Sequence, residues 1–268
     1  MSDRVTVDIV DHIADVRLSR PDKMNALDPA MFNALSETGR DLAKRADVRV
    51  VVLSGQGKAF CAGLDFASFL SLDTNDPDAD LLTRSAGQAA NRAQSAAWIW
   101  KELPMPVIAA VHGVAYGGGL QIMAAADIRF VAPDARLSVR ELHWGLIPDM
   151  SGTRTLRDVV RLDVLKELTY TARIVPGTDA VALGLATHIA DDPRSAAFEL
   201  AREIAGRNPD AIRGAKHLLD RAYRLDDIDG LLLEEQVQRT LLGTPNQAEA
   251  VTANMEKRAP IFSDPKQV

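Results

Sequence analysis

The fold is decided by one stretch near the middle of the chain, Pro106-Val-Ile-Ala-Ala-Val111, His112-Gly113, Tyr116-Gly117-Gly118-Gly119 and Leu120-Gln-Ile-Met-Ala-Ala-Ala126. Its apolar start is typical of a buried strand, and its apolar end is typical of a helix. The three glycines between them leave backbone N–H groups uncovered at the start of that helix, where a negatively charged oxygen is favoured. The stretch therefore predicts a turn that receives an anionic oxygen, and the alternative is a tight turn without a ligand.

A second glycine turn and two carboxylates accompany this stretch. Cys61-Ala62-Gly63 follows the apolar run 48–53, while Glu141 and Asp149 follow the first glycine turn among apolar neighbours. Two backbone donors from separate turns are what an oxyanion hole needs, and a carboxylate beside it can move a proton. These residues indicate carbonyl chemistry. As alternatives, Glu141 pairs with Arg140 at the surface and Asp149 is only a turn or cap residue.

The other patterns predict an α/β class of fold. Strand patterns lie at 5–9 and 13–18 (a hairpin), 48–53 and 128–131, and helical patterns begin at Asp28-Pro29 and at Gln88. Beyond Gly152 we expect helices and no strands, in the segments 153–161, 164–171, 179–185, 194–206, 210–223 and 228–242 and from Pro245 onward. The simplest division is a core over 1–190 and a helical C-terminal region over 191–268. The acidic, turn-rich segment 73–80 predicts a flexible loop.

Composition narrows the classes of function. The 268 residues are 47% hydrophobic and carry a formal net charge of −6, which disfavours a nucleic-acid partner. No apolar run is long enough to cross a bilayer, and the N-terminus lacks the pattern of a signal peptide, so we expect no membrane partner. The lone Cys61 suits a reducing, cytoplasmic location. The five histidines and Cys61 show no metal-ligand spacing, so we expect no metal site.

Five motifs follow one another along the chain: Arg20-Pro-Asp-Lys-Met-Asn-Ala-Leu27, Phe60-Cys-Ala-Gly-Leu-Asp65, Ala109-Ala-Val-His-Gly-Val-Ala-Tyr-Gly-Gly-Gly119, Glu141 through Pro148, and Glu256-Lys-Arg-Ala-Pro-Ile-Phe262. In this order they resemble the motifs of the enoyl-CoA hydratase/isomerase family of the crotonase superfamily. The resemblance covers nearly the whole chain. It implies a crotonase-like spiral of ββα units with a C-terminal helical oligomerisation region, which builds a homotrimer or a dimer of trimers.

The resemblance also implies an acyl-CoA thioester as substrate, with coenzyme A entering as part of that substrate and no separate cofactor. The thioester oxygen would accept hydrogen bonds from the N–H groups of Ala62 and Gly118 as an enolate forms. The residues expected near coenzyme A or the acyl chain are Lys23, Met24, Ala26, Gly63, Asp65, Phe66, Tyr116, Gly117, Trp144, Lys257 and Phe262, the last two in this chain or in a neighbouring copy.

The chain departs from the family at Gln121. Hydratases of this family hold and activate a water with two glutamates; the second corresponds to Glu141, and the first falls at Gln121. A neutral amide cannot take a proton from water. Double-bond isomerisation needs only one base, so we expect an enoyl- or dienoyl-CoA isomerase with Glu141 as acid/base. Asp149 lies where dienoyl-CoA isomerases place a second proton carrier, although those enzymes also have an acid at the position of Gln121.

Two alternatives remain open at this point. The first is an enoyl-CoA hydratase in which Glu141 acts on a water held by Gln121. The second belongs to another class, a non-catalytic CoA- or RNA-binding relative. The negative charge and the two carboxylates argue against that second alternative.

Overall fold

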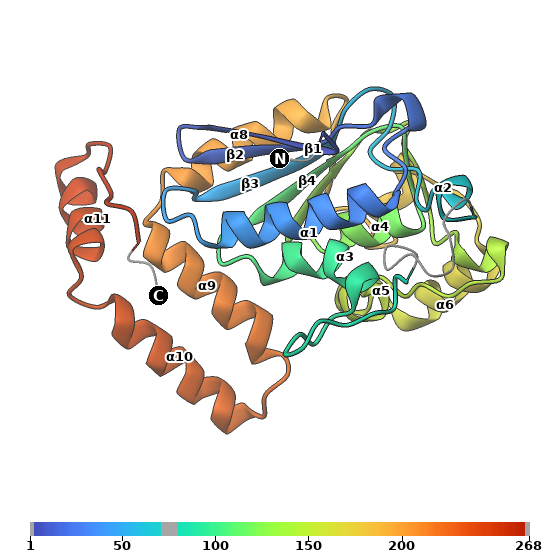
Figure 1. Ribbon diagram of the computed structural model, residues 1–268. Coiled ribbons are helices and arrows are strands. Elements are labelled where there is room, and N and C mark those ends of the chain that lie inside the picture. The colour runs from blue at the N-terminus through green and yellow to red at the C-terminus, as the bar shows by residue number, and fades with distance from the viewer. Residues whose placement is uncertain (1–2, 71–79, 266–268) are drawn as a thin grey trace.

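A six-stranded sheet lies at the centre of the computed structural model, which describes residues 3–70 and 80–265 (Figure 1). Its order is β1-β2-β3-β4-β6-β9, with the bounds β1 (Val5–Val10), β2 (Ile13–Leu18), β3 (Val50–Gly55), β4 (Val107–Val111), β6 (Ile128–Val131) and β9 (His188–Ile189). β1 and β2 form an antiparallel hairpin, as predicted, and the other neighbours pair in parallel.

Helices cover both faces of this sheet (Figure 1). α8 (Pro193–Ala205) lies on one face, and α1 (Pro29–Ala43), α3 (Arg92–Glu102) and α4 (Gly118–Ala124) lie on the other. Side chains of β3 alternate between the two layers: Val50 and Val52 pack with α8, whereas Val51 and Leu53 pack on the opposite side. Burial on both faces explains why this strand reads as an unbroken apolar run.

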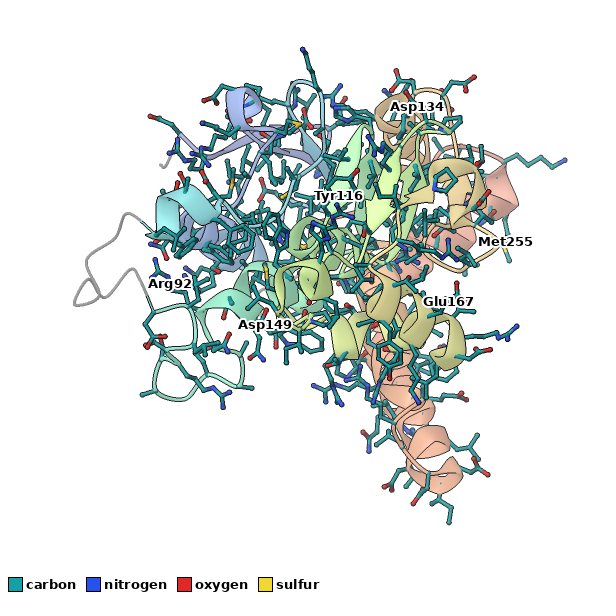
Figure 2. All side chains as sticks on the ribbon, turned by 90° about the vertical axis from the view of Figure 1, so that its right-hand side faces the viewer. Arg92, Tyr116, Asp134, Asp149, Glu167 and Met255 are labelled. Carbon is teal, nitrogen blue, oxygen red and sulfur yellow. The ribbon has the colours of Figure 1, made fainter. Side chains whose placement is uncertain are left out.

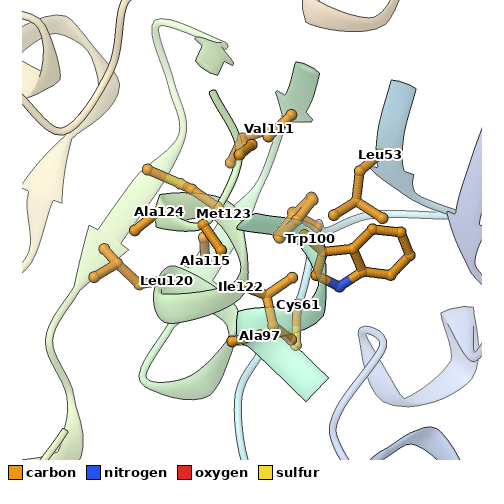
Figure 3. Packing of buried hydrophobic residues seen from close by; sticks show 14 of the residues in the cluster. Leu53, Cys61, Ala97, Trp100, Val111, Ala115, Leu120, Ile122, Met123 and Ala124 are labelled. Carbon is orange, nitrogen blue, oxygen red and sulfur yellow. The ribbon is translucent and has the colours of Figure 1, made fainter. Parts of the chain in front are cut away.

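Local signals set the helix starts. The side chain of Asp28 accepts a hydrogen bond from Met31 N at 2.8 Å, and Pro29 occupies the first turn of α1. Asn91 and Gln94 form a reciprocal capping box at the start of α3. The predicted start of that helix at Gln88 is therefore wrong by four residues. In α3, the buried Trp100 packs into the core beside Leu53 (Figure 3).

A smaller sheet and several short helices accompany the large sheet. The sheet has the order β5-β7-β8, with β5 (Val114–Tyr116), β7 (Arg136–Ser138) and β8 (Val175–Pro176). The helices are η1 (Pro21–Lys23), α2 (Phe66–Leu70), η3 (Glu141–Trp144), α5 (Gly152–Thr155), η4 (Leu156–Asp158), α6 (Leu162–Thr171) and α7 (Gly177–Ala180). The expectation of no strands beyond Gly152 is wrong, because β8 and β9 each add two residues to existing sheets.

Three helices close the chain: α9 (Pro209–Ala222), α10 (Asp227–Leu241) and α11 (Pro245–Glu256). They extend to one side of the sheet, away from α2 and α6 (Figure 1). The division at residue 190 stays a prediction; α8, which follows it, packs on the six-stranded sheet. The predicted loop at 73–80 lies, except for Asp80, outside the described residues. Within the described parts of the chain, no helix has the length and apolar character needed to cross a membrane.

Candidate active site

The two glycine turns lie against each other. Cys61 pairs with Ala115, because Cys61 N donates to Val114 O at 3.0 Å and Tyr116 N donates to Cys61 O at 3.1 Å. A Cβ added at Gly63 would lie 2.7 Å from Tyr116 O and 3.8 Å from Gly118 N, and φ at Gly63 is +88°. Only glycine permits this approach, which brings the turn at 61–65 next to the start of α4.

Ala62 is not available as an oxyanion donor in this structure. Its N–H donates to Met24 O at 2.9 Å. This bond belongs to a short parallel ladder between residues 24–27 and 62–65, in which Leu27 N also donates to Gly63 O and Asp65 N donates to Leu27 O. The expectation for Ala62 is therefore corrected: docking of the loop at 20–28 occupies its donor.

Leu64, in the same turn, has an open backbone donor. Its neighbours Gly63 and Asp65 both bond to Leu27, so the N–H of Leu64 points to the opposite side of the chain. That side faces β5 and Gly118, since Cys61 bonds to β5 on the same edge. Among the described residues, no backbone acceptor bonds to Leu64 N. Sequence reasoning missed this donor because the loop that distinguishes Leu64 from Ala62 lies far away along the chain.

Gly117 and Gly118 present the second set of donors. Gly117 has φ +50° and ψ −118°, a conformation open to glycine, and its N–H donates to Ser138 O at 3.0 Å. Gly118 then begins α4, so its N–H has no partner within the helix. A Cβ added at Gly118 would lie 2.6 Å from Met150 Sδ and 2.7 Å from Leu27 Cδ1, so these two side chains already fill that side of the residue.

Glu141 is a buried carboxylate at the start of η3, with 9% of its surface exposed. Its Oε1 accepts a hydrogen bond from Gln121 Nε2 at 2.5 Å, and its Oε2 is buried with no partner among the described residues. A Cβ added at Gly117 would lie 3.4 Å from Oε1, which places the carboxylate beside the glycine turn. Burial raises the pKa of Glu141 above its ordinary value, and the charge of Asp149 adds to this shift.

The alternative surface role for Glu141 is wrong. Its neighbour Arg140 donates to Ala172 O at 3.3 Å and lies over the ring of Tyr116, 5.8 Å from the ring centre. Glu141 instead contacts the fully buried Gln121 of α4. The structure thus brings together Glu141 and the glycine turn that sequence reasoning singled out separately.

Asp149 lies in the turn just before α5. Its side chain is exposed at the surface, and no hydrogen bond or ion pair from another described residue holds its carboxylate. Partial loss of water nevertheless raises the pKa of Asp149. Figure 2 shows Asp149 and Tyr116 near the middle of the side that carries α2 and α6, and Met255 of α11 toward the edge.

The loop at 20–28 contacts the turn at 61–65 through charged groups. Asp65 accepts a hydrogen bond from Arg20 Nη1 at 2.7 Å and another from Ser68 Oγ at 2.7 Å. These bonds outweigh partial burial and lower the pKa of Asp65. In the same loop, Lys23 and Met24 are exposed and Ala26 is half-buried. They leave a surface next to the turn at 61–65 that a ligand can contact.

Aromatic side chains flank the same region. The rings of Phe66 and Trp144 lie 4.7 Å apart, and 57% of Trp144 is exposed. An exposed indole that packs on a second ring forms an open apolar wall. In contrast, Lys257 and Phe262 follow α11 on the far side of the sheet (Figure 1), where Arg49 Nη2 donates to Phe262 O at 2.9 Å. The structure does not bring these two residues of one chain to Glu141.

Comparison with known proteins identifies the family. The enoyl-CoA hydratase/isomerase family model matches residues 8–265. The chain belongs to this family. It is 34% identical over 256 residues to the mitochondrial Delta(3,5)-Delta(2,4)-dienoyl-CoA isomerase of Rattus norvegicus, covering 92% of this chain and 77% of the relative. It is 29% identical over 245 residues to the mitochondrial methylglutaconyl-CoA hydratase of Mus musculus, covering 89% and 75%.

Solved structures confirm the fold. The crystal structure of an enoyl-CoA hydratase from Bacillus anthracis matches with a TM-score of 0.88 at 30% identity, covering 97% of this chain and 98% of that one. The enoyl-CoA hydratase of Mycobacterium smegmatis matches with a TM-score of 0.85 at 29% identity, covering 96% and 98%. The chain therefore has the crotonase fold with a C-terminal helical region.

Proposed function

We propose that this family member is an acyl-CoA isomerase that moves a double bond of an enoyl- or dienoyl-CoA thioester. One observation carries the proposal: a single buried carboxylate, Glu141, lies beside the glycine turn and contacts the neutral Gln121. The 34% identity to a dienoyl-CoA isomerase supports it. A base that removes a proton and returns it elsewhere on the chain needs no activated water.

In the proposed mechanism, the thioester oxygen accepts hydrogen bonds from Leu64 N–H and Gly118 N–H. Negative charge grows on this oxygen as the enolate forms, so the two donors stabilise the transition state more than the bound substrate. Glu141 removes a proton from the carbon chain with Oε2, and this oxygen or Asp149 returns a proton at another carbon. Conjugation then shifts along the acyl chain with no net gain or loss of atoms.

The raised pKa values suit these roles. Burial makes the ionised form of Glu141 a stronger base than an exposed glutamate, and it also lets the protonated form persist until the proton is returned. Asp149 has the same direction of shift but an exposed side chain, so solvent can exchange its proton. The pair supports transfer between two positions of an extended dienoyl chain.

The experiment offers the purified protein 2-enoyl-, 3-enoyl- and 3,5-dienoyl-CoA in separate assays and follows the absorbance of the conjugated thioester. Isomerisation raises the 2-enoyl absorbance from a 3-enoyl substrate, or converts the 3,5-diene to a 2,4-diene. A fall in absorbance with 2-enoyl-CoA would establish hydration and replace this proposal with the hydratase alternative. Glu141→Gln should abolish whichever reaction is seen, with Glu199→Gln on the exposed side of α8 as the matched control.

We also propose that the chain assembles as a homotrimer or a dimer of trimers. None of the residues of α10 is buried, and the C-terminal helices expose large apolar side chains, including Tyr223 (90%), Ile228 (72%) and Leu231 (65%). An apolar surface of this extent favours a protein contact. A second copy would cover it and could supply the Lys257 and Phe262 that one chain keeps away from its own site. Sedimentation equilibrium measures the assembly.

A further inference from the structure

We propose that Gln121 is a positioning residue that holds Oε1 of Glu141, so that Oε2 is the one oxygen that carries the proton, and that ties Glu141 to the turn bearing Asp149. The kinetic part of this inference rests on the proposed function, whereas the bonding part does not. This positioning role, and not the binding of a water, would then account for the amide at position 121.

The orientation of the Gln121 amide follows from its two partners. Nε2 donates to Glu141 Oε1 at 2.5 Å, and Oε1 of Gln121 accepts from Gly152 N at 2.8 Å. The reversed amide would set an oxygen against a carboxylate and an NH2 group against an N–H donor. Gln121 is fully buried, so neither bond is exchanged freely with solvent. The side chain thus bridges Glu141 and Gly152 in one defined sense.

This bridge makes the two oxygens of Glu141 unequal. Oε1, an oxygen of the charged carboxylate, already accepts a short hydrogen bond from Gln121 Nε2. This bond weakens its ability to take a proton. Oε2 is buried and has no partner among the described residues. A buried carboxylate oxygen without a donor is the more basic of the two. The proton therefore goes to Oε2.

The same bridge fixes the second proton carrier. Gly152 lies three residues after Asp149 and begins α5, so the bond from Gly152 N to Gln121 anchors the turn that carries Asp149. Ser151, between them, has φ +69°, and Met150 packs against Gly118. Gln121 thereby sets the place of Glu141 and of the Asp149 turn together, through its bonds to Glu141 and Gly152.

The first experiment measures the titration of Glu141 directly, by the carboxyl carbon signal of glutamate-labelled protein, with the signal assigned through its loss in Glu141→Gln. Gln121→Met keeps the side-chain length but removes both hydrogen bonds. The charged form of Glu141 then loses its donor, and its midpoint should rise by about one pH unit. Gln88→Met, an exposed position, is the matched control and should leave the midpoint unchanged.

A second variant tests the bridge without touching Gln121. A Cβ at Gly152 would lie 2.7 Å from Gln121 Oε1, so Gly152→Ala should push the amide aside and raise the midpoint in the same direction. This clash involves the end of a flexible side chain, so folding should survive, as circular dichroism will check. Unchanged midpoints in both variants would overturn the proposal, whatever the substrate.

Kinetic measurements then distinguish a positioning role of Gln121 from a purely structural one. With an active substrate, Gln121→Met should move the acid limb of the pH profile of kcat toward higher pH, by as much as the titration midpoint of Glu141 rises, and should change KM little. Gln121→Glu should show turnover in the pH window between the two macroscopic pKa values of the carboxyl pair, where the introduced group keeps a proton to donate to Glu141 and can still accept from Gly152. A uniform loss at every pH would contradict positioning. If the wild-type protein has no activity on any of the thioesters, the proposed function is refuted, whereas the titration result still tests the bonding of Gln121.

Discussion

Arg20 Nη1 lies 2.7 Å from Oδ2 of Asp65 and joins the loop at 20–28 to the turn that carries Leu64. Both side chains are mostly buried, with 12% and 14% of their surfaces exposed. The pair reinforces the backbone ladder that occupies the N–H of Ala62 and leaves that of Leu64 open. One ion pair therefore helps determine which backbone donor faces the proposed substrate.

Asp65→Asn should lower the free energy of unfolding by about 2 kcal/mol at pH 7, because a charged, largely buried hydrogen-bond partner is lost. The pKa of Asp65 is lowered in the folded protein, so its contribution is present above the unfolded pKa, about 4, and disappears as pH falls through the folded pKa. Urea unfolding at pH 7 and at about pH 2 measures the difference. Asp163→Asn, in an exposed pair with Arg161, is the control and should have little effect. An Asp65→Asn effect that grows on acidification would contradict this account.

Glu141→Gln should lower kcat at least about 100-fold and yet make the protein more stable at pH 7. The pKa of Glu141 is raised on folding, so the wild type loses stability as pH rises from the unfolded pKa, about 4, through the folded one. The neutral amide of the variant carries no buried charge, so it has no such cost in stability, and its oxygen still accepts a hydrogen bond from Gln121. Thermal unfolding at pH 4 and pH 7 tests this: the gain should be present at pH 7 and absent at pH 4. Lower stability at pH 7 would show that the carboxylate is needed for folding.

Sequence reasoning succeeded where a pattern is local. The strand at 107–111 and the helix after Gly117 follow from apolar runs and glycines, and Asp28-Pro29 marks the start of α1 to the residue. The two-residue strands β8 and β9 are too short for any periodic signal, so they were missed. Their pairing depends on β7 and β6, which lie elsewhere in the chain.

The candidate site shows the same limit. Glu141 and the glycine turns were found from residue type and order, but the choice between Ala62 and Leu64 depends on the distant Met24 and Leu27. The bond from Gly152 N to Gln121 likewise joins residues 31 positions apart. A glutamine in an apolar helix gives no signal of its partners, because both are set by packing.

Gly63→Ala should remove activity and destabilise the fold. The residue has φ +88°, and a Cβ would lie 2.7 Å from the backbone oxygen of Tyr116, which cannot move as a side chain does. Strain of this kind costs about 1–3 kcal/mol before the clash is counted. Gly230→Ala, in α10 with nothing within 4 Å, should instead stabilise by up to about 1 kcal/mol. Urea unfolding compares the two, and equal stabilities would contradict the steric argument.

Cys61 should be unreactive in the folded protein although it lies in the turn at 61–65, next to the start of α4. It is completely buried, its Sγ donates to Asn25 O at 3.1 Å, and burial raises its pKa to about 12. Since the thiolate is the reactive form, almost none is present at pH 8. A disulfide reagent should therefore modify no thiol in native protein and one per chain in urea, with turnover unchanged before unfolding. Rapid native labelling with loss of turnover would instead show that Cys61 is accessible and reactive, against this account.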